Sequence, residues 1–158
     1  MKKLFIIISL VWLSISGYAQ ADLMDDLEAY FSAMIVSDID SSISWYSNAL
    51  GFEVINKVEF KERGFKQSNL KKGKILIELI ELDNAVSPKD AIPDYSSKTR
   101  LIGFFKTGFL VSNFDKWMIH LESQNIKFHG QIVTDEKTGK KMAIVKDPDG
   151  NRIQIFEK

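Results

Sequence analysis

Hydrophobic and polar positions follow the same plan in two stretches of the chain. The first stretch begins with an apolar run at Phe31–Val36, which is typical of a strand. Ser37 or Asp38 then stands at an N-cap position, and apolar side chains follow at helical spacing up to Gly51, which is a good helix terminator. Alternation with a period of two predicts three further strands, at positions 52–60, 65–71 and 75–82.

The second stretch predicts the same order of elements. An apolar run is followed by a helix with Asn113 as its N-cap. Pro148 and Gly150 predict a tight turn before the last strand, with Gly150 in the left-handed conformation. The predicted strands are 104–111, 126–133, 141–145 and 152–156, and positions 83–101 between the two stretches read as a linker or flap.

The two stretches align at a nearly constant offset. Val36-Ser37-Asp38 lies 75 residues before Val111-Ser112-Asn113, and Glu78 lies 76 residues before Gln154. Each stretch is therefore interpreted as one βαβββ module, at about 31–82 and about 102–158. The strands and helices predict an α+β fold. Modules of this size bury little surface alone, so we predict that the two pair into an eight-stranded, rolled mixed sheet around a cleft, with the helices outside.

Composition excludes several function classes. The chain of 158 residues is 45% hydrophobic and 27% charged, as expected for a soluble globular domain. Lys plus Arg and Asp plus Glu both number 21, so no basic excess indicates nucleic acid as a partner. The absence of Cys excludes disulfides, zinc sites built on thiolates and a Cys nucleophile.

The first 21 residues predict a secretory signal peptide. Lys2 and Lys3 precede an apolar run, Leu4–Leu13, and Ala19-Gln20-Ala21 resembles a cleavage site. The run is shorter than the ~20 residues that span a membrane. We therefore predict that the protein is exported to the periplasm or secreted, with no membrane attachment after cleavage and a single domain at 22–158.

Two motifs carry a resemblance to a known family. The run Ile35-Val36-Ser37-Asp38, followed by Trp45-Tyr46 and Ala49-Leu50-Gly51-Phe52, resembles the opening of vicinal oxygen chelate (VOC) proteins. Asp147-Pro148-Asp149-Gly150-Asn151 resembles their closing signature. The superfamily includes glyoxalase I, extradiol dioxygenases, bleomycin-binding proteins and methylmalonyl-CoA epimerase. The resemblance covers about residues 31–158 and implies the fold rather than one function.

The resemblance also implies four positions to inspect. Metal-dependent members place ligands on the first and fourth strands of each module, drawn from His, Glu and sometimes Gln. In this chain the four positions hold Phe31, Glu78, Lys106 and Gln154. Phe has no lone pair to donate, Lys is a cation, and Gln is a weak neutral ligand. We therefore predict no metal cofactor, with Glu78 as the only candidate ligand at these positions.

Three interpretations of these four positions stay open. Glu78 and Lys106 can form a buried ion pair bridged by Gln154. Alternatively, with Phe31, they bind a small molecule through a few polar groups in an apolar pocket. In the third interpretation, Lys106 or Glu78 transfers a proton in a reaction.

Three function classes follow. The leading one is an exported, metal-free, bleomycin-resistance-like protein that binds a small molecule. The second is a glyoxalase-like lyase or isomerase, or a dioxygenase, with a reduced metal site, so the sequence leaves open whether the protein is an enzyme. The third is an interaction protein with a filled cleft. The resemblance further implies that a homodimer can build the cleft between two chains.

The two His residues are weaker candidates for a functional role. His120 lies within the second helix, where packing against neighbours is the expected role. His129 lies in a predicted strand and is a secondary candidate for the rim of the cleft.

Overall fold

The computed structural model describes residues 29–96 and 98–158. The predicted signal peptide lies outside these residues. The chain divides into two units, Met1–Tyr30 and Phe31–Lys158, and the fold below is that of the second unit. In the part of the chain that the structure describes, no helix is long and apolar enough to cross a membrane.

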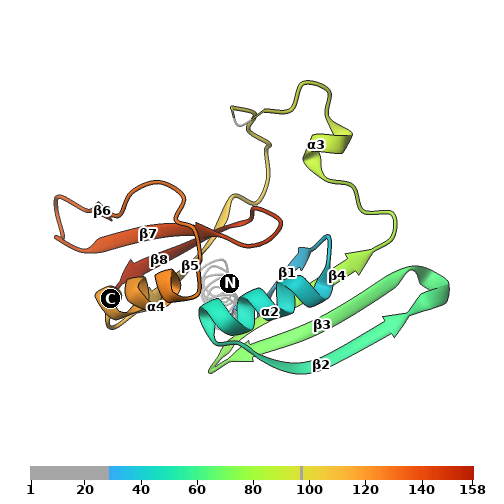
Figure 1. Ribbon diagram of the computed structural model, residues 1–158, viewed down its shortest axis with the longest axis horizontal. Helices are drawn as coiled ribbons and strands as arrows, with labels where there is room; N and C mark the ends of the chain where they lie inside the picture. The colour runs from blue at the N-terminus through green and yellow to red at the C-terminus, as the bar shows by residue number, and fades with distance from the viewer. Residues whose placement is uncertain (1–28, 97) are drawn as a thin grey trace, which may run out of the picture. The chain divides into compact units, whose positions relative to one another are not determined.

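Module 1 is a four-stranded sheet with one helix packed on it (Figure 1). The strand order is β1-β4-β3-β2, with β1 parallel to β4 and the other neighbours antiparallel. A 3₁₀ turn, η1 (Lys61–Arg63), joins β2 to β3. The elements are β1 (Phe31–Ile35), α2 (Ile39–Leu50), β2 (Glu53–Phe60), β3 (Phe65–Lys72) and β4 (Ile75–Leu82).

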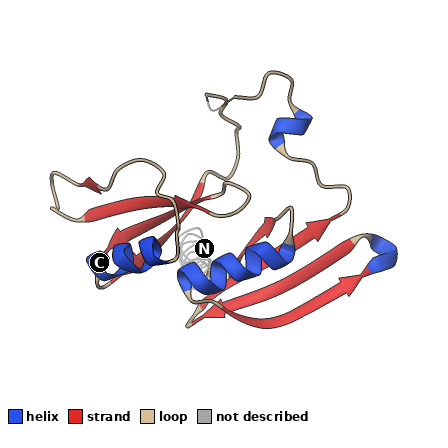
Figure 2. Ribbon diagram, in the orientation of Figure 1, coloured by secondary structure: helices blue, strands red, loops and turns tan. Residues whose placement is uncertain are grey.

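Module 2 repeats this arrangement, with the order β5-β8-β7-β6 and β5 parallel to β8 (Figure 2). The predicted pair of βαβββ modules is therefore confirmed. The eight strands form two four-stranded sheets, and no ladder joins these sheets among the described residues. The short helix α3 (Pro88–Ala91) lies in the segment between the modules, and the elements of module 2 are β5 (Lys106–Val111), α4 (Phe114–Ser123), β6 (Val133–Thr134), β7 (Lys141–Lys146) and β8 (Arg152–Glu157).

Local sequence signals set the ends of both main helices. The Asp38 carboxylate accepts a hydrogen bond from Ser41 N at 2.7 Å and caps α2. Asn113 caps α4 in the same way, through Lys116 N at 3.3 Å. Gly51 ends α2 with φ at 71°, a left-handed conformation that a residue without Cβ adopts at little cost. Both predicted caps and the predicted terminator are confirmed.

One predicted strand is mostly wrong. The alternation at 126–133 indicates a strand, yet only Val133 of this range lies in β6, and Phe128 makes an isolated bridge to Val145. Gly130 has φ at 89°, which takes the backbone out of the extended region. His129 N still donates to Ile144 O at 2.6 Å. The segment therefore follows the edge of β7 without forming a regular ladder.

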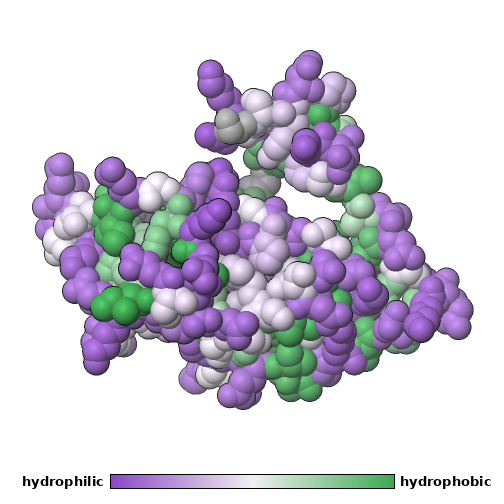
Figure 3. Space-filling model, in the orientation of Figure 1, coloured by the Kyte–Doolittle hydropathy of each residue, from purple (hydrophilic) through white to green (hydrophobic). Residues whose placement is uncertain are grey.

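The two modules share one hydrophobic core. It contains Tyr46 from α2 together with Leu79, Phe114 and Ile155, all buried. The rings of Phe52 and Phe109 lie 6.1 Å apart and bring the two modules into contact. In the view of Figure 3, apolar residues also reach the surface in patches between hydrophilic ones.

A buried polar link crosses the same boundary. Tyr46 Oη donates to Asp147 Oδ2 at 3.0 Å, and Asn151 Nδ2 donates to the same oxygen at 2.9 Å. The Asp147 carboxylate lies beside the Tyr46 hydroxyl, and burial first and this charge second raise the pKa of Tyr46 well above its usual range. At the surface, Ser37 N donates to Asp149 Oδ1 at 3.1 Å. The turn that carries the closing motif therefore adds polar contacts between module 2 and module 1 to those of the shared core.

Candidate functional site

Strand alternation places all four predicted residues on the sheet faces that lie opposite the helices. Ile77 and Leu79 of β4 are buried in the core under α2, so Glu78 between them points to the other side of the sheet. In β8, Gln154 lies in the same way between the core residues Ile153 and Ile155. We call the side of each sheet opposite its helix the open face. Phe31 and Lys106 lie on the open faces of β1 and β5 by the same alternation.

The open face of module 1 carries a row of hydrogen-bonded polar side chains. Gln67 of β3 donates through Nε2 to Glu78 Oε1. Beside it, Asn69 Nδ2 donates to Asn56 Oδ1 at 2.9 Å. Gln67 therefore orients the Glu78 carboxylate through one oxygen, and no hydrogen bond to its second oxygen is found among the described residues. Phe31 pairs with Leu76, one row from Glu78 on the same face.

The open face of module 2 holds Gln154 in an unusual environment. Its side chain is only 2% exposed. Its Nε2 lies 2.9 Å from Met142 Sδ, a weak acceptor, and its Oε1 has no hydrogen-bond partner among the described residues. A buried amide oxygen without a donor is costly and requires an explanation. Gly108 faces Gln154 across the β5–β8 pairing and contributes no side chain there.

One of the three interpretations, an ion pair between Glu78 and Lys106, is not found among the described residues. Glu78 accepts from Gln67 instead, and the Lys106 side chain is exposed. Among the described residues no hydrogen bond or ion pair joins Glu78 to Lys106 or to Gln154. The physical reason is that the two sheets are separate, so within one chain each open face orders its own polar groups.

The two His residues have different surroundings. His120 packs against α2, with Nε2 at 3.1 Å from the carbonyl oxygens of both Asn48 and Ala49, which confirms its packing role. His129 lies in the irregular segment beside β7 rather than in a strand. Burial first, and then the positive charges of Lys146, Arg152 and Arg100, lower the pKa of His129. The imidazole is therefore held toward its neutral form near several cations.

Arg152, Lys146 and Gln67 were not predicted as site residues from the sequence pattern. Arg152 pairs with Lys106 on one side and with Lys146 on the other, so the three side chains form a row across the open face. The Arg152 guanidinium lies 4.6 Å from the centre of the Phe105 ring. The alternation Arg152-x-Gln154 already indicates a shared face, whereas the positions of Lys146 and Gln67 depend on register that only the fold supplies.

The residues at the four family positions do not fit a divalent metal ion. Phe31 has no donor atom, and Lys106 carries a positive charge that repels a cation. Glu78 supplies the only carboxylate of the set, and one of its oxygens already accepts from Gln67. Among the described residues, no group of three or more His, Cys, Asp or Glu side chains is arranged to hold a metal ion.

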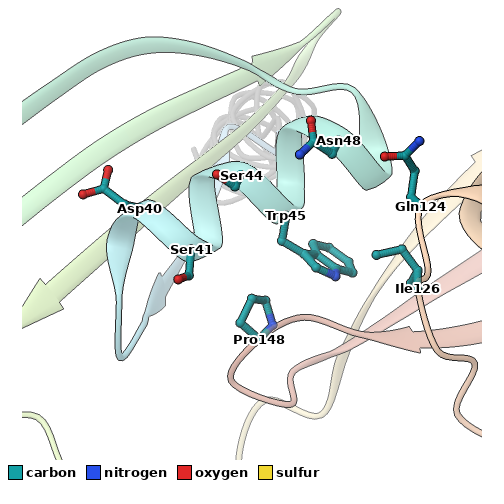
Figure 4. A pocket seen from close by; sticks show the side chains of 8 residues that line it. All are labelled: Asp40, Ser41, Ser44, Trp45, Asn48, Gln124, Ile126 and Pro148. Carbon is teal, nitrogen blue, oxygen red and sulfur yellow. The ribbon is translucent and has the colours of Figure 1, made fainter.

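A separate groove lies on the helix side of the molecule (Figure 4). It has a volume of about 540 Å³ and lies between α2 and two loops of module 2. Trp45 points from α2 toward Ile126 and Pro148, while Asp40, Ser41 and Asn48 line the α2 side. None of the four family positions lines this groove.

Comparison with known proteins agrees with this geometry. Residues 21–155 match the model of the Glyoxalase/Bleomycin resistance protein/Dioxygenase superfamily. The chain belongs to this superfamily. The VOC resemblance of its two sequence motifs is thereby confirmed.

Several known proteins resemble the chain over most of its length. The glyoxalase family protein from Enterococcus faecalis is 25% identical, with a TM-score of 0.71 over 84% of this chain and 98% of that one. The crystal structure of SMU.1112c is 33% identical, with a TM-score of 0.67 over 84% of this chain and 100% of that one. The uncharacterized protein YwkD of Bacillus subtilis is 29% identical over 79% of this chain and 92% of its own.

Proposed function

We propose that this glyoxalase-like protein binds a small molecule on its open faces without a metal ion at the four family positions. The observation that carries the proposal is Gln154. Its amide is nearly completely buried, and its oxygen has no donor among the described residues. A ligand that donates a hydrogen bond to this oxygen removes the cost of the unpaired group.

The open face of module 1 supports the same proposal. Glu78 is partly exposed, and Gln67 orients its carboxylate through one oxygen. Around it lie apolar side chains, including Phe31, which is 55% exposed, and Ile35, which is 57% exposed. A few oriented polar groups among apolar side chains are typical of ligand sites.

Binding through Gln154 is tested by thermal shift with a library of small amphiphiles on the full chain and on Gln154→Met. The substitution keeps the size of the side chain and removes its hydrogen-bonding groups. We expect ligands that raise the unfolding temperature of the wild type to lose most of that effect in the variant. Gln124→Met is the matched control, because Gln124 is exposed and lies at the end of α4. Equal shifts in all three proteins would contradict the proposal.

The proposal that no metal ion is held at the four family positions is tested separately, with Mg²⁺, Mn²⁺, Ni²⁺ and Zn²⁺ in the same thermal-shift assay. We expect no shift that depends on Glu78, because a single carboxylate without further donors holds these ions weakly. A large shift with any of them that Glu78→Ala abolishes would overturn this part. It would favour instead the metal-dependent lyase, isomerase or dioxygenase with a reduced site.

We also propose that a second copy of the chain completes the binding cleft. Apolar side chains of both open faces are exposed in the single chain, including Ile35 at 57% and Leu110 at 68%. The open face of module 1 carries Glu78, and that of module 2 carries Lys106 and Arg152. Beside Glu78 the open face of module 1 also carries one cation, Lys71. Glu78 gives the module 2 cations a partner of opposite charge, which favours contact between module 1 of one copy and module 2 of the other.

Export is a further part of the proposal and rests on the sequence of residues 1–21 alone. The charged start, the short apolar run and Ala19-Gln20-Ala21 support it. N-terminal sequencing of protein recovered from the periplasmic or secreted fraction tests it. A first residue near position 22 is the expected result, and an intact Met1 in the cytoplasmic fraction would contradict it.

A further inference from the structure

The open face of module 2 carries a concentration of positive charge that the fold does not require. Lys106, Arg152 and Lys146 are direct neighbours on β5, β8 and β7. Among the described residues, none of the three forms an ion pair. Like charges directly opposite each other in a sheet are destabilising. The row therefore contains two unfavourable pairs with no acidic partner.

The internal repeat provides a comparison within the same molecule. The matching row of module 1 is Phe31, Leu76 and Lys71, joined by the same pairings of β1, β4 and β3. It contains one cation where module 2 contains three. The charge of the row is therefore a property of module 2 and not of the strand geometry.

The adjacent row of module 2, which contains Gln154, carries no negative charge. Module 1 has Glu78 at the position where module 2 has Gln154. Gln154 lies two residues from Arg152 on the same face of β8, so a carboxylate there would partly neutralise the cations. If module 1 of a second copy faces this row, its Glu78 adds one negative charge against three positive ones. A net positive surface remains in either case.

Two further features lie at this row. The Arg152 guanidinium lies against the Phe105 ring, 4.6 Å from its centre, which restrains it while its edge can still donate hydrogen bonds. The Gln154 amide, 2% exposed, adjoins the row with its oxygen unpartnered. Oxygen and nitrogen of an amide exchange places by a half-turn, so this group can accept from or donate to a ligand. Burial first, and the positive charges of Lys146, Arg152 and Arg100 second, lower the pKa of the nearby His129.

We propose that module 2 binds the oxyanion of a small amphiphilic ligand, a carboxylate or a phosphate, between Lys106, Arg152 and Lys146. The ligand continues past Gln154 along the open face, where Leu110 and Phe156 offer apolar contact. Planar guanidinium and flanking ammonium groups are suited to both oxyanions. This inference rests on the proposed small-molecule function and specifies the charge of the ligand.

The test compares three probes with the same chain length: hexanoate, hexyl phosphate and the neutral hexanamide. Each is titrated into the full chain and followed by ¹⁵N NMR, with the backbone amides of β8 and the Gln154 side-chain amide as reporters. We expect at least one anion to bind ten or more times as tightly as hexanamide, and its affinity to fall as salt is added. The tighter of the two anions identifies the preferred oxyanion.

Charge removal tests the assignment to this row. In Lys106→Gln combined with Arg152→Gln, we expect the anion to bind no more tightly than hexanamide. The control removes two charges from the hairpin turn of the same module, as Lys137→Gln combined with Lys140→Gln, and we expect anion binding to stay within twofold of the wild type. Thermal midpoints of both variants establish that they fold.

The outcomes separate this inference from the function on which it rests. Equal affinity for hexanoate, hexyl phosphate and hexanamide would overturn the oxyanion site and leave the small-molecule site in place. Anion binding that survives the Lys106 and Arg152 substitutions would also overturn it. If none of the three probes perturbs the reporters, the oxyanion site and the proposed binding function both fail.

Discussion

At the scale of single residues, the Tyr46 hydroxyl makes a buried hydrogen bond between the two modules. It is completely buried and donates to the Asp147 carboxylate at 3.0 Å. Tyr46→Phe keeps the ring and leaves a buried carboxylate with one donor fewer. We expect a loss of about 1–3 kcal/mol in the free energy of unfolding, measured by urea denaturation.

Tyr95→Phe is the control for this substitution. Tyr95 lies in the segment between the modules and is 39% exposed, so removal of its hydroxyl is expected to cost less than about 0.5 kcal/mol. Equal effects of the two substitutions would show that the bond between Tyr46 and Asp147 does not hold the modules together.

Lys106 is predicted to destabilise the fold, because it pairs with the like-charged Arg152 across β5 and β8. Lys106→Gln removes a like-charge pair and is expected to raise the free energy of unfolding by about 0.2–1 kcal/mol, nearer the lower figure because the side chain is exposed. Urea denaturation at low and high salt measures it. The gain should shrink at high salt, whereas a loss of stability at low salt would mean that Lys106 has a structural role.

At the scale of elements, the caps of α2 and α4 differ in one useful respect. Hydrogen bonds from Ser41 lower the pKa of Asp38 from its ordinary value of 3.8. The folded state therefore favours the carboxylate, and the stabilisation is present at neutral pH and lost as the pH falls through the lowered pKa. Asp38→Ala should be less stable than the wild type at pH 7, with the difference shrinking below about pH 4.

Asn113→Ala is the matched comparison, because Asn113 caps α4 with an amide that does not titrate. The difference in free energy of unfolding between Asn113→Ala and the wild type, measured by denaturation across pH 3 to 7, should stay constant. If the loss of free energy of unfolding in Asp38→Ala is equally independent of pH, the carboxylate charge contributes nothing to the cap.

Elements also show why sequence predicted the fold better than the site. Caps, terminators and period-two alternation are local, so both modules and the face of each strand could be predicted. Gly130 departs from the extended backbone for reasons that alternation does not record, and the strand expected at 126–133 was mostly wrong. The partners of Glu78 and Gln154 depend on the neighbouring strands, so the sequence left an ion pair with Lys106 as one open interpretation and did not indicate Gln67.

At the scale of the whole molecule, the hydrophobic core and the open faces have different roles. The helix sides of both sheets contribute to one core, which accounts for the stability of the single chain. The open faces retain exposed apolar residues, the Glu78 carboxylate on module 1 and three cations on module 2. A second copy related by a twofold axis would bring unlike faces together twice, because such an interface is self-complementary.

This arrangement predicts a dimer that depends on the open faces. Light scattering coupled to size-exclusion chromatography should give twice the chain mass for the wild type. Ile35→Glu or Leu110→Glu introduces a charge at a position that is exposed in the single chain but buried between two copies, so each should give the chain mass. Ile119→Glu is the control: Ile119 is 66% exposed but belongs to α4, on the helix side. A monomeric wild type, or dissociation by Ile119→Glu alone, would contradict a cleft completed by the open face of a second copy.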